Sequence, residues 1–248
     1  MKKFDLIVFD IDGTLTRSKL PLDEEMADLL CQLLSKYKVA IISGASYEQF
    51  QWQILDLLKC SPDKMLNLFL LPVDGSIYCY EEDRWQCKYD EQLSEKEKGM
   101  IKRAFEDIFK KSGLENPEKI YGELTEDRGA QLNFSALGQD APIEIKEKWD
   151  PDNKKRERMI EVLKQELPVF SMRIGGTTSI EVTKAGIDKA YGIKKLLAQT
   201  GILKEKLVYF GDKLFKGGND EPVLKLGIEC KAVSGPEDTK KVILELLA

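Results

Sequence analysis

The stretch FDLIVFDIDGT (residues 4–14) places two carboxylates directly after a run of apolar residues. A short, near-continuous apolar run is typical of a strand that is buried on both faces of a parallel sheet. Asp10 and Asp12 follow this run with one residue between them, and burying two like charges without a partner would be costly. The stretch therefore predicts a buried strand that ends at a site for a cation or for a reaction.

Buried strands and amphipathic helices alternate on both sides of the middle of the chain. Further strands are predicted at residues 38–43, 206–212 and 227–233. Helices are predicted at residues 23–37, 46–59, 186–201 and 236–247. Asp23 is a candidate N-cap for the first of these helices. This alternation predicts an α/β fold with a doubly wound, Rossmann-like parallel sheet.

The middle of the chain has another pattern, with charged helices and strands in which polar and apolar residues alternate. These elements are predicted at residues 93–113, 126–138, 151–167 and 170–186. They indicate an α+β insert, the cap, at residues 84–187, within a core made of residues 1–83 and 188–248. A basic cluster in the insert is interpreted as a solvent-exposed helix face; it consists of Lys154, Lys155, Arg156 and Arg158.

Composition excludes several classes of function. The chain is 42% hydrophobic and 33% charged with a net charge of −5, which is unlike the basic excess of nucleic-acid binders. No apolar stretch approaches the ~20 residues that span a bilayer, and the N-terminus does not have the pattern of a signal peptide. The cysteines are odd in number and irregularly spaced, so we expect reduced thiols in a cytoplasmic protein. They are Cys31, Cys60, Cys79, Cys87 and Cys230.

The chain contains no histidine, which excludes imidazole chemistry, including Ser-His-Asp triads and phosphohistidine. No cysteine is followed six residues later by arginine, as a cysteine-dependent phosphatase loop requires. The glycine-rich nucleotide-binding motifs GxxxxGK[ST] and GxGxxG are also absent. Any reaction must therefore use carboxylates, hydroxyls, lysine, arginine or a metal.

Hydroxyl or carboxylate side chains follow three of the predicted strands. Asp10 and Asp12 follow the first strand, Ser43 ends the second, and Asp212 ends the strand at 206–212. Ligands of open α/β sheets bind beyond the carboxyl ends of the strands, so we expect these residues to share one site. A calcium loop starting at Asp10 is excluded because its twelfth position, which requires glutamate, is Pro21.

These motifs resemble those of the haloacid dehalogenase superfamily of aspartate-dependent phosphotransferases. FDIDGTLT, IISG, GIDK and GDKLFKGGND occur in the order of the superfamily's four motifs. The resemblance implies that Asp10 is the nucleophile, Asp12 the general acid and base, and that Ser43 and Lys189 contact the phosphoryl group.

The same resemblance implies a Mg²⁺ site held by Asp10, the main-chain carbonyl of Asp12, and Asp212. Asn219 and Asp220 are expected near the metal or among the residues that support its ligands. An alternative is that Asn219 and Asp220 only cap the following turn.

Within the superfamily the chain is most similar to eukaryotic-type phosphomannomutases. Its RGAQLNFSALG and GGTTSIEV segments resemble two cap strands of that family, which implies substrate-binding roles at four positions. These are Arg128, Asn133, Ser179 and Glu181. Glutamate at 181 replaces the family's aspartate. Gln139 and Lys146 stand where the family has arginines, and neither side chain offers the bidentate phosphate recognition of arginine.

Two functions remain open after this comparison. Ser43 occupies a position where phosphatases tend to have a hydroxyl and the mutases glycine. With the departures at Gln139 and Lys146, this favours a Mg²⁺-dependent phosphatase for a small phosphorylated metabolite, such as a sugar phosphate. A phosphomannomutase-type hexose-phosphate mutase is the alternative. A non-catalytic binding module is disfavoured because the motif carboxylates and Lys189 are present. We expect a monomer or homodimer without nucleic-acid or membrane partners.

Overall fold

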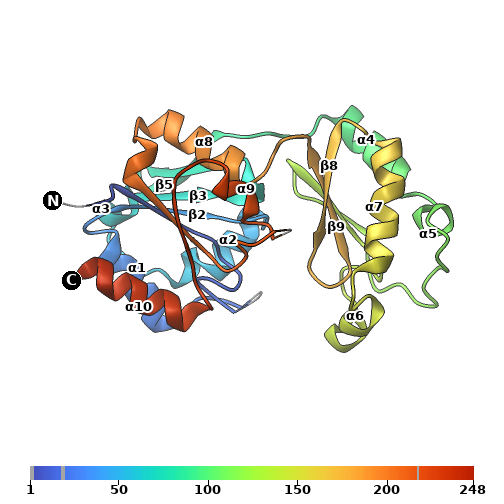
Figure 1. Cartoon of the computed structure of the whole chain (residues 1–248), viewed down its shortest axis with the longest axis horizontal. Helices are drawn as coiled ribbons and strands as arrows, with labels where there is room; N and C mark the ends of the chain where they lie inside the picture. Colours follow the sequence, from blue (N-terminus) through green and yellow to red (C-terminus); the bar gives the residue numbers. More distant parts are fainter. Residues whose placement is uncertain (1–2, 18–19, 217) are drawn as a thin grey trace. The chain divides into compact units, whose positions relative to one another are not determined.

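The computed structural model describes residues 3–17, 20–216 and 218–248, so that Gly217 of the fourth motif lies outside the described residues. The fold is α/β, as predicted. The chain divides into two compact units (Figure 1). Unit 1 contains Met1–Asp90 and Ile187–Ala248, and unit 2 contains Glu91–Gly186.

Unit 1 is built around a seven-stranded sheet in the order β11-β10-β1-β2-β3-β4-β5. The pairs among β11, β10, β1, β2 and β3 are parallel, whereas β4 and β5 are added antiparallel. The strands are β1 Leu6–Phe9, β2 Lys38–Ile42, β3 Leu68–Leu71, β4 Ile77–Glu81, β5 Arg84–Tyr89, β10 Leu207–Gly211 and β11 Glu229–Ala232.

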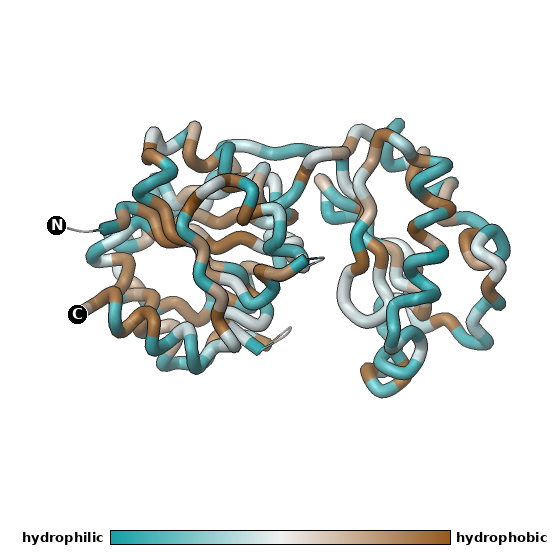
Figure 2. Tube along the Cα trace, in the orientation of Figure 1, coloured by the Kyte–Doolittle hydropathy of each residue, from teal (hydrophilic) through white to brown (hydrophobic). Residues whose placement is uncertain are grey.

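Helices cover both faces of this sheet (Figure 1). Alternate residues of β1 point to opposite faces: Ile7 and Phe9 pack in the cluster that contains α1, α2 and α10, and Leu6 and Val8 pack with α8 and α9. Strands β1 and β3 are accordingly apolar at every position, and hydrophobic residues predominate in the centre of this sheet (Figure 2). The helices are α1 Glu24–Leu33, α2 Tyr47–Gln53, α3 Pro62–Met65, α8 Lys189–Thr200, α9 Glu221–Leu224 and α10 Pro236–Leu247, with 3₁₀ turns η1 Leu55–Leu57, η2 Pro72–Asp74 and η3 Lys204–Lys206.

Side-chain caps fix where three of these helices begin. The Asp23 carboxylate accepts a hydrogen bond from the Met26 main-chain nitrogen at 2.8 Å, which confirms the predicted N-cap of α1. Ser46 caps α2 and Asp188 caps α8 in the same manner. Because Asp188 is the cap, Lys189 is the first residue of α8.

Unit 2 contains a four-stranded antiparallel sheet in the order β6-β7-β9-β8. One face of this sheet packs against α4, α5 and α7 through the apolar side chains of β7 and β9. The other face carries polar side chains. The elements are α4 Glu95–Phe105, α5 Ile108–Lys111, β6 Thr125–Asp127, β7 Gln131–Ser135, α6 Ile143–Trp149, α7 Lys154–Glu166, β8 Phe170–Gly175 and β9 Ser179–Lys184.

Two elements of unit 2 differ from the prediction because residues with positive φ interrupt them. The helix expected at 93–113 is two helices, α4 and α5, separated at Asp107, whose φ of 57° is incompatible with a continuous helix. The strand expected at 126–138 is a hairpin in which β6 and β7 are joined by a turn at Gly129. The Gly129 nitrogen donates to Asp127 Oδ1 at 2.9 Å.

The prediction placed residues from 84 onward in the insert, but β5 (Arg84–Tyr89) pairs with β4 in the sheet of unit 1. The two strands form a hairpin whose turn residues, Glu82 and Asp83, both have positive φ. Local pairing across this turn therefore attaches β5 to the sheet of unit 1.

The basic cluster on α7 differs from the prediction of a solvent-exposed face at one position. Arg156 is only 1% exposed. Its Nε donates to Asp150 Oδ2 at 2.8 Å, and its Nη1 donates to the carbonyls of Gly175 and Gly176 at 2.7 and 2.8 Å. Arg156 thus joins α7 to the turn between β8 and β9, and its buried charge is balanced by Asp150.

The expectation of five reduced thiols is wrong for two of them, because Cys31 and Cys60 form a disulfide. Cys31 lies on α1 and Cys60 follows η1, and folding brings their Cα atoms to 5.4 Å although 29 positions separate them. The irregular spacing along the chain gave no sign of this proximity. The other three cysteines are free.

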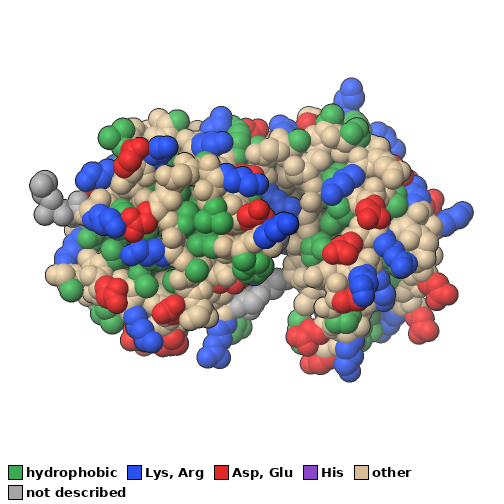
Figure 3. Space-filling view, in the orientation of Figure 1, with side chains coloured by type: hydrophobic (Ala, Val, Ile, Leu, Met, Phe, Trp, Pro, Cys, Tyr) green, Lys and Arg blue, Asp and Glu red, His purple; other side chains and the backbone are tan. Residues whose placement is uncertain are grey.

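On the face shown in Figure 3, acidic and basic side chains are interspersed. Within the described parts of the chain, none of the helices combines the length and the apolarity that crossing a membrane requires.

Candidate active site

The predicted site residues of unit 1 lie at one edge of the seven-stranded sheet. Strand β1 pairs with β2 on one side and β10 on the other, with Phe9 opposite both Ile41 and Phe210. The chain therefore leaves β1 at the point where the order of strands reverses, and this is where ligands of such sheets bind. The loops after these three strands carry Asp10 and Asp12, Ser43, and Asp212.

The centre of the site is the Lys189 ammonium group, which is fully buried between two carboxylates. Lys189 Nζ lies 2.6 Å from Asp10 Oδ1 and 2.6 Å from Asp220 Oδ1. Asp10 and Asp220 are 2% and 0% exposed. One buried cation is thus shared by two buried anions, so the cluster has a negative charge when both carboxylates are ionised.

The pKa values of these groups follow from burial and from each other's charges. Burial raises the pKa of Asp10 to about 7, although the Lys189 ammonium counteracts it. Burial also opposes ionisation of Asp220, but contacts with Lys189 and Tyr209 outweigh it and lower the pKa of Asp220. For Lys189, burial works to lower the pKa, whereas Asp10, Asp220 and Asp74 raise it above its usual value. The contacts with Lys189 and Tyr209 therefore favour the ionised form of Asp220, whereas the charge of the buried Asp10 carboxylate is less fully compensated.

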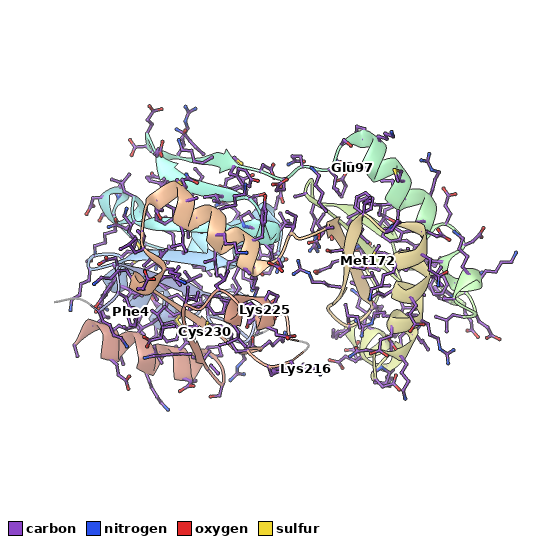
Figure 4. The ribbon with its side chains drawn as sticks, turned by 45° about the horizontal axis from the view of Figure 1, so that its top comes forward. Phe4, Glu97, Met172, Lys216, Lys225 and Cys230 are labelled. Atoms are coloured by element: carbon purple, nitrogen blue, oxygen red, sulfur yellow. A yellow bond between two sulfur atoms is a disulfide. The ribbon has the colours of Figure 1, made fainter. Side chains whose placement is uncertain are left out.

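The Asp220 side chain is held by further hydrogen bonds. Tyr209 on β10 donates its hydroxyl to Asp220 Oδ1 at 2.6 Å, and the Lys213 main-chain nitrogen donates to Oδ2 at 3.0 Å. Asp220 precedes α9, but its side chain makes no capping hydrogen bond to that helix. The capping alternative therefore does not hold for Asp220. Lys216, labelled in Figure 4, marks the loop between β10 and α9 that carries these contacts.

The carboxylates are arranged as a hard divalent cation would require. Ligand oxygens of Asp10, Asp212 and Asp220 all lie within 4.8 Å of one another. Asp212 Oδ1 is buried and has no hydrogen-bond partner among the described residues. Burial raises the pKa of Asp212, so a nearby cation would stabilise its ionised form. An all-oxygen donor set with an unused buried oxygen fits Mg²⁺.

Gly13 keeps space open beside this donor set. Its φ of +84° disfavours a side chain, and a Cβ placed there would collide with the Asp212 carboxylate. The neighbouring Thr14 is fully buried, and its Oγ1 has no partner within the part of the chain that the structure describes. Asn219 Oδ1 is also a buried atom without a hydrogen-bond partner among the described residues. Buried polar atoms of this kind need a partner, such as a water molecule, an ion or a ligand.

Asp12 and Ser43 lie in the loops that follow the neighbouring strands β1 and β2. The Asp12 side chain is a hydrogen-bond acceptor for Gln53 of α2, with 3.1 Å between Gln53 Nε2 and Asp12 Oδ1. Ser43 is 7% exposed, and its Oγ accepts a hydrogen bond from the Ala45 nitrogen at 3.2 Å. Its hydroxyl hydrogen is therefore available for an additional acceptor, such as a phosphoryl oxygen.

In unit 2, four of the residues predicted to bind substrate lie on or beside the polar face of its sheet. Asn133 and Glu181 are opposite each other on β7 and β9, and Ser179 pairs with Ser135, whose hydroxyl oxygen is 3.1 Å away. Arg128 follows β6 and donates to Glu126 Oε2 at 2.8 Å. The arginine is thus already charge-compensated by a neighbouring glutamate.

Gln139 and Lys146 form a separate pair next to this sheet. The Lys146 ammonium donates to the main-chain carbonyl of Gln139 at 2.8 Å. The side-chain nitrogen of Gln139 is buried and, among the described residues, has no acceptor. These two positions therefore present a neutral amide donor and an ammonium group already bonded to main chain.

Sequence reasoning missed three residues of the site in unit 1: Gln53, Asp74 and Tyr209. Gln53 could have been noticed as a polar residue on the apolar side of a helix, one turn after Phe50. Tyr209 lies in the middle of an otherwise apolar strand, where its hydroxyl needs a partner. Asp74, in the left-handed region at φ 58°, follows a strand that was not considered as part of the site.

Comparison with known proteins agrees with this geometry. Residues 26–248 match the family model of eukaryotic phosphomannomutase. The chain is 28% identical to a phosphomannomutase of Saccharomyces cerevisiae over 255 residues, which cover 97% of this chain and 93% of that protein. It is also 28% identical to phosphomannomutase 2 of Dictyostelium discoideum, over 88% of this chain and 86% of the relative.

Solved structures share the fold at lower sequence identity. An N-terminally truncated IMP-nucleotidase of Plasmodium falciparum matches with a TM-score of 0.71 at 21% identity, over 98% of this chain and 70% of that one. A haloacid dehalogenase-like hydrolase from Bacteroides thetaiotaomicron matches with a TM-score of 0.64 at 17% identity, over 98% and 100% of the two chains. These likenesses bear on the fold alone.

Proposed function

We propose that this chain, which belongs to the eukaryotic phosphomannomutase family of haloacid dehalogenase-type phosphotransferases, is a Mg²⁺-dependent hexose-phosphate mutase that works through an aspartyl phosphate at Asp10. The observation that carries the proposal is the buried Asp10–Lys189–Asp220 cluster with Asp212 beside it. It combines a carboxylate nucleophile, a fixed cation and an oxygen donor set in one place.

The side chains divide the reaction as follows. Asp10 attacks the phosphorus of the substrate, and the phosphorus–oxygen bond to the sugar breaks as the aspartyl phosphate forms. Lys189 balances charge on Asp10 and on the phosphoryl oxygens. Ser43 donates its hydroxyl to one of those oxygens. Asp12 gives a proton to the departing sugar oxygen and takes a proton from the hydroxyl that next accepts the phosphoryl group.

Asp10, Asp212 and the main-chain carbonyl of Asp12 would hold Mg²⁺, which when bound supplies positive charge against the repulsion between the nucleophile and the phosphoryl group. Asp220 lies within reach of the same donor set, but its contacts with Lys189, Tyr209 and Lys213 support a primary role in positioning the lysine.

A sugar-phosphate phosphatase is the second candidate, and specific observations favour it. Ser43 replaces a family glycine at the second motif, and Gln139 offers a neutral donor where the family has an arginine. A mutase must retain a sugar bisphosphate between its two half-reactions, so the loss of a guanidinium weakens retention of the distal phosphate. We propose that the polar face of unit 2 recognises the sugar, with Asn133, Ser179 and Glu181 as hydroxyl partners.

The decisive experiment measures both activities on one preparation. Interconversion of hexose 1- and 6-phosphates is followed with Mg²⁺ and a catalytic amount of hexose 1,6-bisphosphate, and release of inorganic phosphate is followed in parallel. A mutase interconverts the monophosphates many times for each phosphate released, and a phosphatase gives the reverse ratio. The Asp10→Asn variant, which keeps the shape of the side chain, must lose both activities.

Either activity in Asp10→Asn at more than a few per cent of the unaltered rate would refute the nucleophile. Absence of both activities in the unaltered chain across hexose phosphates would refute the substrate class. Localisation in the cytoplasm and a monomeric or homodimeric state stay predictions, to be measured by fractionation and by light scattering.

A further inference from the structure

Gln53, the last residue of α2, makes polar contacts with the loop that carries Asp12. It is fully buried, on the side of the helix that also buries Phe50. Its Nε2 lies 3.1 Å from Asp12 Oδ1, 3.1 Å from Thr16 Oγ1 and 3.0 Å from the Leu20 carbonyl. One amide group thus faces three oxygen acceptors of a single loop.

The orientation of this amide is determined by its neighbours. Gln53 Oε1 accepts a hydrogen bond from Gln49 Nε2 at 3.0 Å, one helical turn earlier. Exchanging the amide oxygen and nitrogen would place the oxygen against the Asp12 carboxylate and the Leu20 carbonyl, neither of which can donate a hydrogen bond. In the observed orientation the two N–H groups can donate to two of the three loop oxygens at a time, so we assign them to the side that faces the Asp12 loop.

The same loop is tied to α2 through its main chain. The Leu22 nitrogen donates to the Gln53 carbonyl at 3.0 Å, and within the loop the Gly13 nitrogen donates to the Thr16 carbonyl at 2.8 Å. A bridge between Asp12 and Thr16 completes the turn. The end of α2 therefore fixes both the path of this loop and the Asp12 side chain.

We infer that Gln53 is a positioning residue for the general acid and base of the reaction: its amide holds the Asp12 carboxylate in the rotamer that exchanges a proton with the sugar oxygen. The inference rests on the proposed role of Asp12. A buried amide costs free energy unless its hydrogen bonds are made, and here its donors are directed to a residue of the reaction.

If Gln53 has this role, the effect of replacing it depends on the leaving group. A sugar alkoxide is a poor leaving group and requires the proton from Asp12, whereas p-nitrophenolate leaves without one. We expect Gln53→Met, which fills similar space but donates no hydrogen bond, to slow release of the sugar about ten- to a hundredfold. Release of p-nitrophenolate should change by less than about twofold, and KM for both substrates should be retained.

The measurement is the pre-steady-state burst of the released alcohol with Mg²⁺ present, because the burst reports phosphoryl transfer to Asp10 alone. Gln51→Met is the matched control: Gln51 lies on the same helix, is exposed, and bonds to Asp56 rather than to the Asp12 loop. It should leave both bursts unchanged. Gln53→Glu is a second variant that keeps the shape and the acceptor for Gln49, and it should lose the sugar burst at least as severely.

Equal losses on both substrates would show that Gln53 only supports the fold, and an unchanged sugar burst would show that it is dispensable; either result overturns the inference. Asp12→Ala is measured beside these variants, so that a failure of the inference on Gln53 can be distinguished from a failure of the proposed role of Asp12. If Asp12→Ala discriminates between the leaving groups and Gln53→Met does not, the inference on Gln53 fails while the proposed function stands. If Asp12→Ala does not discriminate, both fail.

Discussion

Replacing Lys189 with methionine removes the only cation that contacts Asp10 and Asp220 in the described part of unit 1. The ammonium lies 2.6 Å from an oxygen of each carboxylate, and all three side chains are at most 3% exposed. Removing one partner of a buried ion pair typically costs about 3–5 kcal/mol, since the remaining charge is left without compensation. We expect Lys189→Met to lower the free energy of unfolding of the metal-free protein by at least this amount at pH 8.

The loss should depend on pH in a defined direction. Without the ammonium, the folded-state pKa of Asp220 rises from below its usual value to well above it. A carboxyl with a raised folded-state pKa stabilises the fold at low pH and loses that contribution as pH rises through the folded value. The folded variant then binds about one more proton than the folded unaltered protein. The difference in free energy of unfolding between the two proteins should therefore grow by up to about 1.4 kcal/mol per pH unit between pH 5.5 and 8.

Lys240→Met is the matched control for this experiment. Lys240 Nζ lies within 3.0 Å of Asp23, Glu25 and Glu237, but the side chains of these partners are 53–75% exposed. Water can rehydrate them, so we expect a cost of about 1 kcal/mol and little dependence on pH.

Urea unfolding at pH 5.5 and pH 8, with chelator present, measures both variants. Added Mg²⁺ should restore part of the stability of Lys189→Met, because a cation near the carboxylates replaces the missing charge. A deficit below about 1 kcal/mol at pH 8, or one that does not shrink at pH 5.5, would refute the view that Lys189 neutralises two buried anions.

Three further predictions concern other parts of the molecule. Reduction of Cys31–Cys60, which closes a loop of 29 positions, should lower unfolding stability by about 3–4 kcal/mol in urea; thiol counting that finds five free cysteines under non-reducing conditions would contradict the bond. Gly13→Ala should displace the Asp212 carboxylate and raise the Mg²⁺ concentration for half-maximal activity at least about tenfold in a metal titration; an unchanged titration would show that the space is not needed. Gln139→Arg should tighten hexose bisphosphate binding at least about tenfold by calorimetry, and no change would contradict a distal phosphate site at this position.

Strands β1, β2, β10 and β11, the start of α1 and the polar residues that follow three of these strands can be predicted from the sequence because they depend on local patterns. The run at residues 6–9 is apolar on every residue because both faces of β1 are covered, and Asp23 can cap α1 using atoms three residues away. Parallel strands bring their carboxyl ends to one edge, so the sequence alone predicts that Asp10, Ser43 and Asp212 lie at the same edge of the sheet.

Contacts between distant segments were decided only by tertiary packing. The hydrogen bonds from Gln53 to Asp12 and from Tyr209 to Asp220 join elements whose spacing in the chain carries no periodic signal. The same holds for Arg156. Its position in a basic run predicted exposure to solvent, but the orientation of α7 buries its side chain against Asp150.

The disulfide has the same origin, whereas β5 joins the sheet of unit 1 through a local hairpin with β4. Cys31 and Cys60 meet because α1 and the segment after η1 pack on one face of that sheet. Sequence patterns report which side of an element is buried, whereas the identity of the group on the other side depends on how the elements pack in three dimensions.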